Sequence, residues 1–289
     1  MQLSIIYFDV LVLQLSVLCT VFGFGLNTTT RDLSYLIHRP GLLARSLVSM
    51  YVVMPAVAVL LALVFDFPVT VERTLMMLAI SPVPPLLPKR EMKAGGNENY
   101  ALGLMAILAL TAIVVMPLEL LVLQRVVGRD LEMASGAVVR VVLVSILLPL
   151  AAGMAVRSVM PKVADWLEKP LGLITNVLLP LSILVLLAIA GPAIWEVVGN
   201  GTLIAIIVFI IVGFRVGHVL GAPDPDQSVV LAMSTACRHP AVALSLAAAN
   251  FPGERFGATI LLCLLVGVVA GMPYVAWHRR HPRTAPRPA

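Results

Sequence analysis

Apolar stretches of spanning length recur along almost the whole of this 289-residue chain. Because a helix that crosses a bilayer needs about 20 apolar residues, the pattern predicts a polytopic helical membrane protein. Hydrophobic residues make up 60% of the sequence and charged residues 12%, whereas about a quarter of an ordinary soluble domain is charged. This composition excludes soluble enzymes, disordered chains and typical nucleic-acid binders. We expect an all-α polytopic fold with a single membrane domain over 1–289.

The apolar stretches number nine, and short connections that contain Gly, Asn and Pro separate them. The three cysteines lie in apolar segments and fit neither a disulfide framework nor a zinc site, so we expect no metal ion and no cofactor. The nine predicted transmembrane helices cover residues 3–26, 42–65, 71–88, 99–124, 136–156, 171–196, 201–220, 227–249 and 256–277.

Positive charge is distributed unequally between the connections on the two sides of these helices. The side that holds the C-terminus has 14 of the 20 Lys and Arg residues, the other side has five, and Arg238 lies inside a helix. Short cytoplasmic loops carry the excess of Lys and Arg. We therefore expect an inner-membrane protein with its N-terminus outside and its C-terminus in the cytoplasm. The basic tail 281–289 then lies beside anionic lipid and implies no nucleic-acid partner.

Two of the nine predicted helices are interrupted. The third runs into residues 82–88, which contain four prolines in seven positions. Proline lacks the N–H and clashes with the preceding turn, so a regular helix cannot continue there. The eighth carries Arg238, His239 and Pro240 in mid-span, and Pro240 disfavours helical geometry at His239. Since non-helical backbone is tolerated at membrane depth only where protein or a water-filled cavity covers it, both breaks are expected to be covered in this way.

Short sequence echoes relate the two halves of the chain. The matching pairs are 78–81 with 231–234 and 13–18 with 179–184. They indicate that helices 1–4, within 1–128, correspond in inverted orientation to helices 6–9, within a second repeat over 133–280 that also holds helix 5. Inverted repeats with interrupted helices in corresponding positions are typical of secondary transporters, whose substrate site lies near the bilayer midplane.

A set of motifs is spread over nearly the whole chain. They are Phe22-Gly23-Phe24-Gly25-Leu26, Met50-Tyr51-Val52-Val53-Met54-Pro55, the Pro-rich break after Ser81, Gly95-Gly96-Asn97, and the break over 236–243. Together they resemble the bile acid:sodium symporter superfamily, and within it a bacterial subgroup described as sodium-dependent transporters. The resemblance implies a core domain of helices 2–4 and 7–9, in which the broken helices cross, and a panel domain of helices 1, 5 and 6. It also implies an organic-anion substrate between the two and alternating access.

The oxygen-bearing residues that coordinate sodium in relatives are largely missing here. Their positions fall at Met50, at Leu87 and Pro88, at Ser234, and at Arg238 with His239. A hard cation needs several oxygen ligands, so we expect transport without sodium coupling. Arg238 would then act as a tethered cation, because the guanidinium stays protonated. A sodium-coupled symporter with a non-standard ion site is the alternative.

Several side chains are candidates for the substrate site or for coupling. Because an arginine in mid-span faces a cavity or a partner, Arg238 either binds the anion or caps free carbonyls at the break. His239 either packs or carries a proton near neutral pH. Glu119 either pairs with Arg238, relays protons or lies near the outer interface. The remaining candidates for substrate contact are Ser81, Ser234, Thr235 and Lys89. Such hydroxyls more often bond backbone carbonyls, and Lys89 equally suits a basic cytoplasmic loop.

The sequence argues against an enzyme, because no span holds paired acids, a His-Glu-x-x-His motif or a Ser/His constellation. The expected function is secondary transport of a small or amphipathic organic anion, and the expected partners are that anion and the lipid bilayer. A channel is an alternative function, since broken helices also line pores. A receptor on the same fold, which binds the ligand without moving it, is the third possibility.

Overall fold

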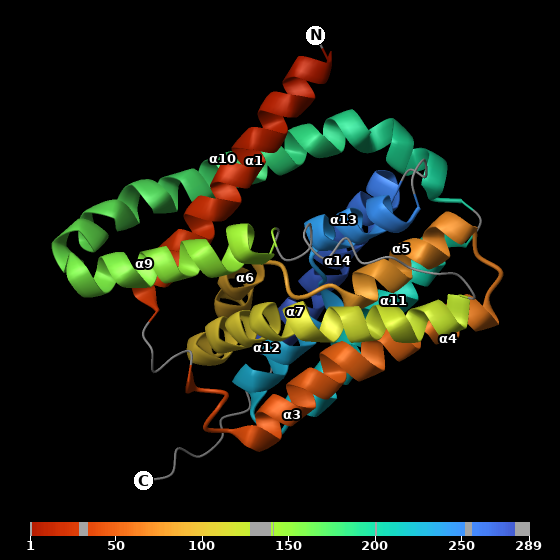
Figure 1. The fold of residues 1–289 in the computed structure, drawn as a ribbon, viewed down its shortest axis with the longest axis horizontal. Coiled ribbons are helices and arrows are strands. Elements are labelled where there is room, and N and C mark those ends of the chain that lie inside the picture. The colour runs from red at the N-terminus through yellow and green to blue at the C-terminus, as the bar shows by residue number, and fades with distance from the viewer. Residues whose placement is uncertain are drawn as a thin grey trace.

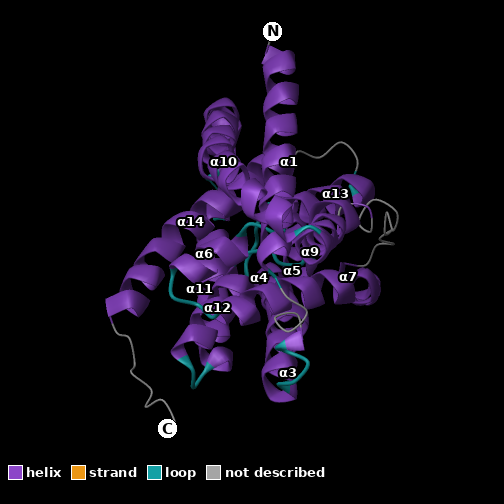
Figure 2. Cartoon of the chain, turned by 90° about the vertical axis from the view of Figure 1, so that its left-hand side faces the viewer, coloured by secondary structure: helices purple, strands orange, loops and turns teal. Residues whose placement is uncertain are grey.

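The structure is a computed structural model that describes residues 2–28, 34–127, 140, 142–199, 201–251 and 256–280. Within these residues every regular element is a helix (Figure 2), as expected for an all-α membrane protein. The first half holds α1 (Gln2–Asn27), α3 (Pro40–Val48), the π-helix η1 (Ser49–Val53), α4 (Met54–Val64), α5 (Val69–Ile80), α6 (Leu87–Lys93) and α7 (Glu98–Val127). The second half holds the π-helix η2 (Leu143–Leu147), α9 (Leu148–Val159), α10 (Pro161–Val197), α11 (Thr202–Gly221), α12 (Pro225–Ala236), α13 (Pro240–Asn250) and α14 (Phe256–Arg280).

Six helical segments of the described chain are long and apolar enough to cross a membrane. They are Pro40–Val64, Glu98–Val126, Pro161–Val185, Thr202–Gly221, Pro225–Ala247 and Phe256–Arg280. Three shorter apolar helices cover Gln14–Asn27, Leu143–Val159 and Leu187–Val197. The chain is therefore a multi-pass membrane protein, and the count of nine spans stays a prediction.

The start of one helix differs clearly from the predicted one. α10 begins at Pro161, well before the expected start at 171, and continues for 37 residues to Val197. Proline is favoured in the first turn of a helix, so Pro161 marks that start. The predicted span 71–88 is interrupted, as expected: α5 ends at Ile80, and α6 begins at Leu87. Parts of the predicted fifth helix and the tail 281–289 lie outside the described residues.

Prolines decide where many helices begin. Each of α3, α6, α10, α12 and α13 carries a proline in its first two positions. The prolines at the start of α4 and α9 differ, because there a π-helix continues directly into the α-helix. The first turn of a helix leaves its N–H groups unpaired, so a residue without an N–H loses nothing there, and its fixed φ already suits the helix. Prolines that interrupt the spans therefore also restart them.

Three helices, α1, α9 and α10, pack closely on one another, and we call them the panel. Figure 1 shows α9 and α10 along one side of the molecule, with α1 crossing both. α1 and α9 meet at two glycines, where a Cβ on Gly25 would lie 2.9 Å from the Cα of Gly153. Arg157 of α9 donates to the Leu26 carbonyl at 2.5 Å and pairs with Asp165 of α10 at 2.6 Å. Arg157 thus joins all three panel helices.

The other helices, α3 to α7 with η1 and α11 to α14, form what we call the core. Its closest helix pair is α11 with α12, which meet along Gly213, Gly217 and Gly221. These glycines are spaced four residues apart, so they share one face of α11. A Cβ on Gly217 would lie 2.5 Å from the Cα of Ala232. In membranes, such stripes of small residues let two helix backbones approach, and here they hold α12 in place.

Candidate functional site

The two interrupted helices meet at their breaks. α5 ends at Ile80 and its partner α6 begins at Leu87, whereas α12 ends at Ala236 and α13 begins at Pro240. The backbone N–H of His239 donates to the carbonyl of Pro82 at 2.8 Å, which joins the two breaks directly. The non-helical backbone of the two breaks is thus covered by protein.

Proline also explains why two carbonyls near this crossing lack their usual helical partners. The Met54 N–H bonds the Ser49 carbonyl in η1, so the next N–H in the π pattern, for the Met50 carbonyl, would come from Pro55. In a helix, the Ser81 carbonyl would accept from the residue at position 85, which is Pro85. Neither proline has an N–H to donate. Unpaired carbonyls are costly inside a membrane protein, so another donor is needed.

Arg238 supplies that donor to both carbonyls. Its Nη1 donates to the Ser81 carbonyl at 3.2 Å and its Nη2 to the Met50 carbonyl at 3.1 Å. The residue is only 4% exposed, and its Nε has no hydrogen-bond partner within the described chain. The guanidinium therefore caps the free carbonyls of η1 and of the first break. Both of its terminal nitrogens already bond backbone, and Nε is buried.

The two coupling candidates, His239 and Glu119, both have buried polar atoms. The ring nitrogens of His239 and both carboxylate oxygens of Glu119 have no hydrogen-bond partner among the described residues. Glu119 lies near enough to Arg238 for the two groups to interact electrostatically. Buried polar groups without partners are uncommon in folded proteins and call for an explanation.

The hydroxyl of Ser234 binds Glu91, a residue that was not among the candidates predicted from the sequence. It donates to Oε1 of Glu91 at 2.6 Å, and Glu91 is fully buried. Oε2 of Glu91 has no partner in the part of the chain that the structure describes. In the sequence, Glu91 lies between Arg90 and Lys93 in a basic run, which resembles a solvated loop. Only the packing of α6 on α12 places it inside.

The other hydroxyl candidates bond backbone. Ser81 donates to the carbonyl of Met77 or Leu78, and Thr235 donates to the Leu231 carbonyl at 2.7 Å. Thr235 also lies 2.6 Å from the Ser49 hydroxyl in η1. Hydroxyls in helices commonly bond carbonyls in this way. Thr235 thus fastens the end of α12 to the same π-helix whose carbonyl Arg238 binds.

Lys89 has its contact at the boundary between core and panel. Its Nζ donates to Oδ1 of Asn176 in α10 at 2.8 Å, in an exposed position. The structure therefore joins Arg238, His239 and Ser81 at the crossing, places Ser234 and Thr235 on α12 beside it, and gives Lys89 a separate role. The bond between Lys89 and Asn176 is thus a polar contact between core and panel.

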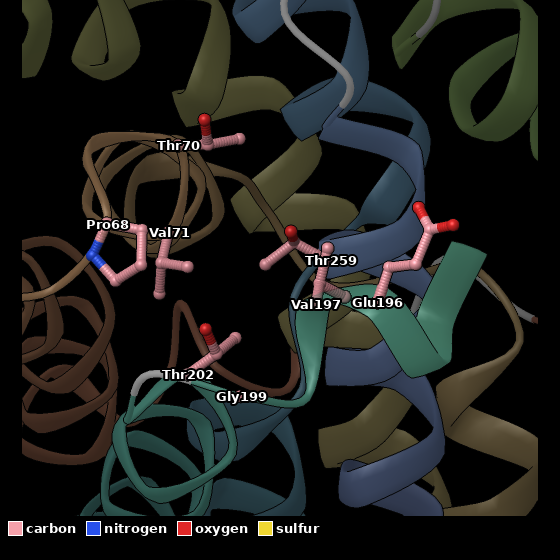
Figure 3. A pocket seen from close by; sticks show the side chains of 8 residues that line it. All are labelled: Pro68, Thr70, Val71, Glu196, Val197, Gly199, Thr202 and Thr259. Carbon is pink, nitrogen blue, oxygen red and sulfur yellow. The ribbon is translucent and has the colours of Figure 1, made fainter. Parts of the chain in front are cut away.

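A cavity of about 300 Å³ also lies at the boundary of panel and core, and it contains none of the predicted site residues. Figure 3 shows the end of α10, at Glu196 and Val197, facing Thr202 of α11 and Thr259 of α14. The Thr259 hydroxyl is buried and has no partner within the described chain. This cavity has both polar and apolar lining residues and lies where α5, α11 and α14 begin, so it is a different place from the crossing.

Comparison with known families gives a match over a large part of the chain. Residues 14–214, more than half of the chain, match the model of the Sodium Bile acid symporter family. The chain belongs to the sodium bile acid symporter family. It is therefore a secondary transporter of the bile acid symporter type, in agreement with the expectation that it is not an enzyme. A comparison with curated proteins gives no match.

The family match covers the first break and ends before the second. α12 and α13, which carry Ser234, Thr235, Arg238 and His239, lie beyond residue 214. The contacts of Arg238 with Ser81 and Met50 nevertheless connect this part of the chain to the matched part. The geometry of the crossing thus provides information on the second break that the family match does not.

Proposed function

We propose that this symporter-family protein moves a small or amphipathic organic anion across the inner membrane by alternating access, without sodium coupling. The anion binds between panel and core, beside the crossing of the two broken helices. Arg238, His239, Ser234, Thr235 and Ser81 line or shape that site. Movement of the panel against the core, with release of the bond from Lys89 to Asn176, then exposes the site to the other side.

One observation supports the proposal that transport is not coupled to sodium. The guanidinium of Arg238 binds the two carbonyls that prolines leave free, which is where a bound cation would find backbone oxygens. Oxygen ligands are what a hard cation needs, and here they are already satisfied. Because this positive charge is covalently attached, it cannot dissociate during the transport cycle.

The same charge favours an anionic substrate. Arg238 is buried at the crossing, and its Nε is free of protein hydrogen bonds within the described residues. α13 begins beside it at Pro240, and helix N-termini present unpaired N–H groups and a partial positive charge. Energy for transport then comes from the substrate gradient, from exchange, or from protons through His239 or Glu119, whose buried polar atoms lack partners.

A transport experiment tests this function. Carboxylates and sulfonates that raise the melting temperature of the purified protein serve as substrates in proteoliposomes. We expect saturable uptake and counterflow of the labelled anion, with the same initial rate when choline replaces sodium. Neutral sterols and organic cations should neither stabilise the protein nor compete.

Four results would contradict the proposal, each in a different part. A steep dependence on sodium would restore a sodium-coupled symporter with a non-standard ion site. Conductance without counterflow would indicate a channel, and stabilisation without any flux would indicate a receptor. If only neutral or cationic compounds stabilised the protein, the proposal of an anionic substrate would be wrong. The proposal that the protein is a transporter would be unaffected.

We further propose nine spans, arranged as inverted repeats over 1–128 and 133–280, with the N-terminus outside. The excess of Lys and Arg on one side of the predicted helices supports this orientation. An alkaline phosphatase fused after Ala289 should be inactive in cells, and a reporter that works in the cytoplasm should be active there. Activity of the phosphatase fusion would invert the topology and remove the basis for the repeat.

A further inference from the structure

A groove between α11 and α14 has no role in the proposed transport site. It has a volume of about 370 Å³ and is lined by Ile211, Phe214, Arg215, His218, Tyr274 and Trp277, among others. No acidic residue of the described chain lines it. Its rim is open to the outside of the protein, since Ile211 is 55% and Trp277 is 47% exposed. This groove therefore combines a cation, aromatic rings and a lipid-facing surface.

Arg215 is the unusual residue in this groove. It is exposed on α11, a helix long and apolar enough to span the membrane. Among the described residues, it makes no hydrogen bond and no ion pair. Arginine in a spanning segment normally pairs or extends to the interface. Arg215 precedes the last residue of α11, Gly221, by about 9 Å along the helix axis, which places its guanidinium within reach of the headgroup layer.

An aromatic wall stands beside this cation. Tyr274 packs against Phe214 with 4.9 Å between ring centroids, and its hydroxyl lies 2.8 Å from Nδ1 of His218. Trp277 contacts the His218 ring edge-on at 5.4 Å. Tyrosine and tryptophan concentrate where the bilayer meets water. The last turn of α14 adds Arg279 and Arg280 at the same end, so the groove lies at a basic interface.

Apolar side chains continue from the groove towards the middle of the bilayer. Ile211 and Ile204 are 55% and 62% exposed, and they lie four and eleven residues before Arg215. At these spacings the three side chains share one face of α11. A chain of methylene groups lying along Ile211 and Ile204 therefore has its polar end at Arg215.

We propose that the groove binds one anionic phospholipid of the membrane. The lipid phosphate accepts hydrogen bonds from the Arg215 guanidinium, whose donor fork suits a phosphate. Trp277 and Tyr274 flank the glycerol region, and an acyl chain runs over Ile211 and Ile204. Zwitterionic lipids fit the groove less well, because their own cationic group competes with Arg215 for the phosphate. This site is separate from the transport site and does not depend on the proposed substrate.

Native mass spectrometry of the full-length protein provides the test. The delipidated protein is titrated with phosphatidylglycerol or phosphatidylcholine of the same acyl composition. We expect one tightly retained phosphatidylglycerol, favoured over phosphatidylcholine by about fivefold or more, since an arginine beside anionic lipid contributes about that factor. Arg215→Gln should remove the preference. Arg125→Gln, which removes an exposed arginine from the last turn of α7, should preserve it.

A second variant separates the groove from the charge. Trp277→Ala should weaken retention of both lipids, and unchanged melting temperatures of the lipid-free variants would show that each protein is folded. Equal retention of the two lipids by the unmodified protein, or an intact preference in Arg215→Gln, would overturn the proposal. Displacement of phosphatidylglycerol from the groove by a bile salt would instead assign it to an organic anion.

Discussion

Replacing Arg238 by alanine should reduce uptake in proteoliposomes to less than a tenth of the unmodified rate. The substitution leaves the Ser81 and Met50 carbonyls without their donor, and hydrogen bonds to a charged group contribute about 1.5–3 kcal/mol each. It also removes the buried positive charge that the proposed anion approaches. Initial rates of uptake, measured with sodium and with choline, provide the readout.

Chemical rescue distinguishes a lost charge from a damaged fold. Millimolar methylguanidinium should restore part of the uptake by Arg238→Ala, because it can occupy the space of the missing side chain and donate to both carbonyls. The control is Arg125→Ala, which removes an exposed arginine from α7 and should transport normally. Full activity of Arg238→Ala in the absence of any added cation would refute the tethered-cation interpretation.

Replacing Gly217 by alanine should sharply destabilise the protein, although the change adds only one methyl group. That methyl carbon would lie 2.5 Å from the Cα of Ala232, so α11 and α12 would have to separate. Overpacking of this kind costs about 1–3 kcal/mol, and backbone contacts cannot be relieved by a change of rotamer. The melting temperature of the purified protein, and the fraction that is monodisperse in detergent, should both fall.

The matched control is Gly172→Ala in α10. A Cβ added at Gly172 meets nothing within 4 Å, and alanine favours a helix over glycine by up to about 1 kcal/mol. This variant should therefore be as stable as the unmodified protein or more so. If both substitutions had the same effect, the contact of α11 with α12 would not be the cause.

The position of Arg238 depends on the packing at Gly217. The three glycines of α11 set how closely α12 packs against it. Arg238 lies just after the end of α12, so this packing determines whether Arg238 reaches the Ser81 and Met50 carbonyls. Thr235 secures the same end to Ser49 of η1. A small displacement of α12 would therefore withdraw the guanidinium from the carbonyls that it caps, so we expect Gly217→Ala to impair transport as well as stability.

Much of the architecture follows from local sequence, because its causes are local. Apolar length predicts spanning helices wherever they lie, and proline breaks a helix whatever surrounds it. The breaks after Ser81 and around His239 were therefore predictable, as was the membership of the family. Pro161, at the start of α10, is a local signal of the same kind.

The partners of the buried polar groups were decided by tertiary structure alone. Arg238 offered two interpretations in the sequence, and only the approach of η1 and the first break shows that it donates to backbone carbonyls. In the sequence, Glu91 resembles part of a solvated basic loop. The packing of α6 on α12 instead buries it and places it beside Ser234. Hydrogen bonds join atoms that lie far apart in the chain, at separations of 157 residues for Arg238 with Ser81 and 143 for Ser234 with Glu91. The residue pattern of a single helix does not show which distant residues it will contact. The hydrogen bonds of the crossing are therefore determined only by how the helices pack against each other.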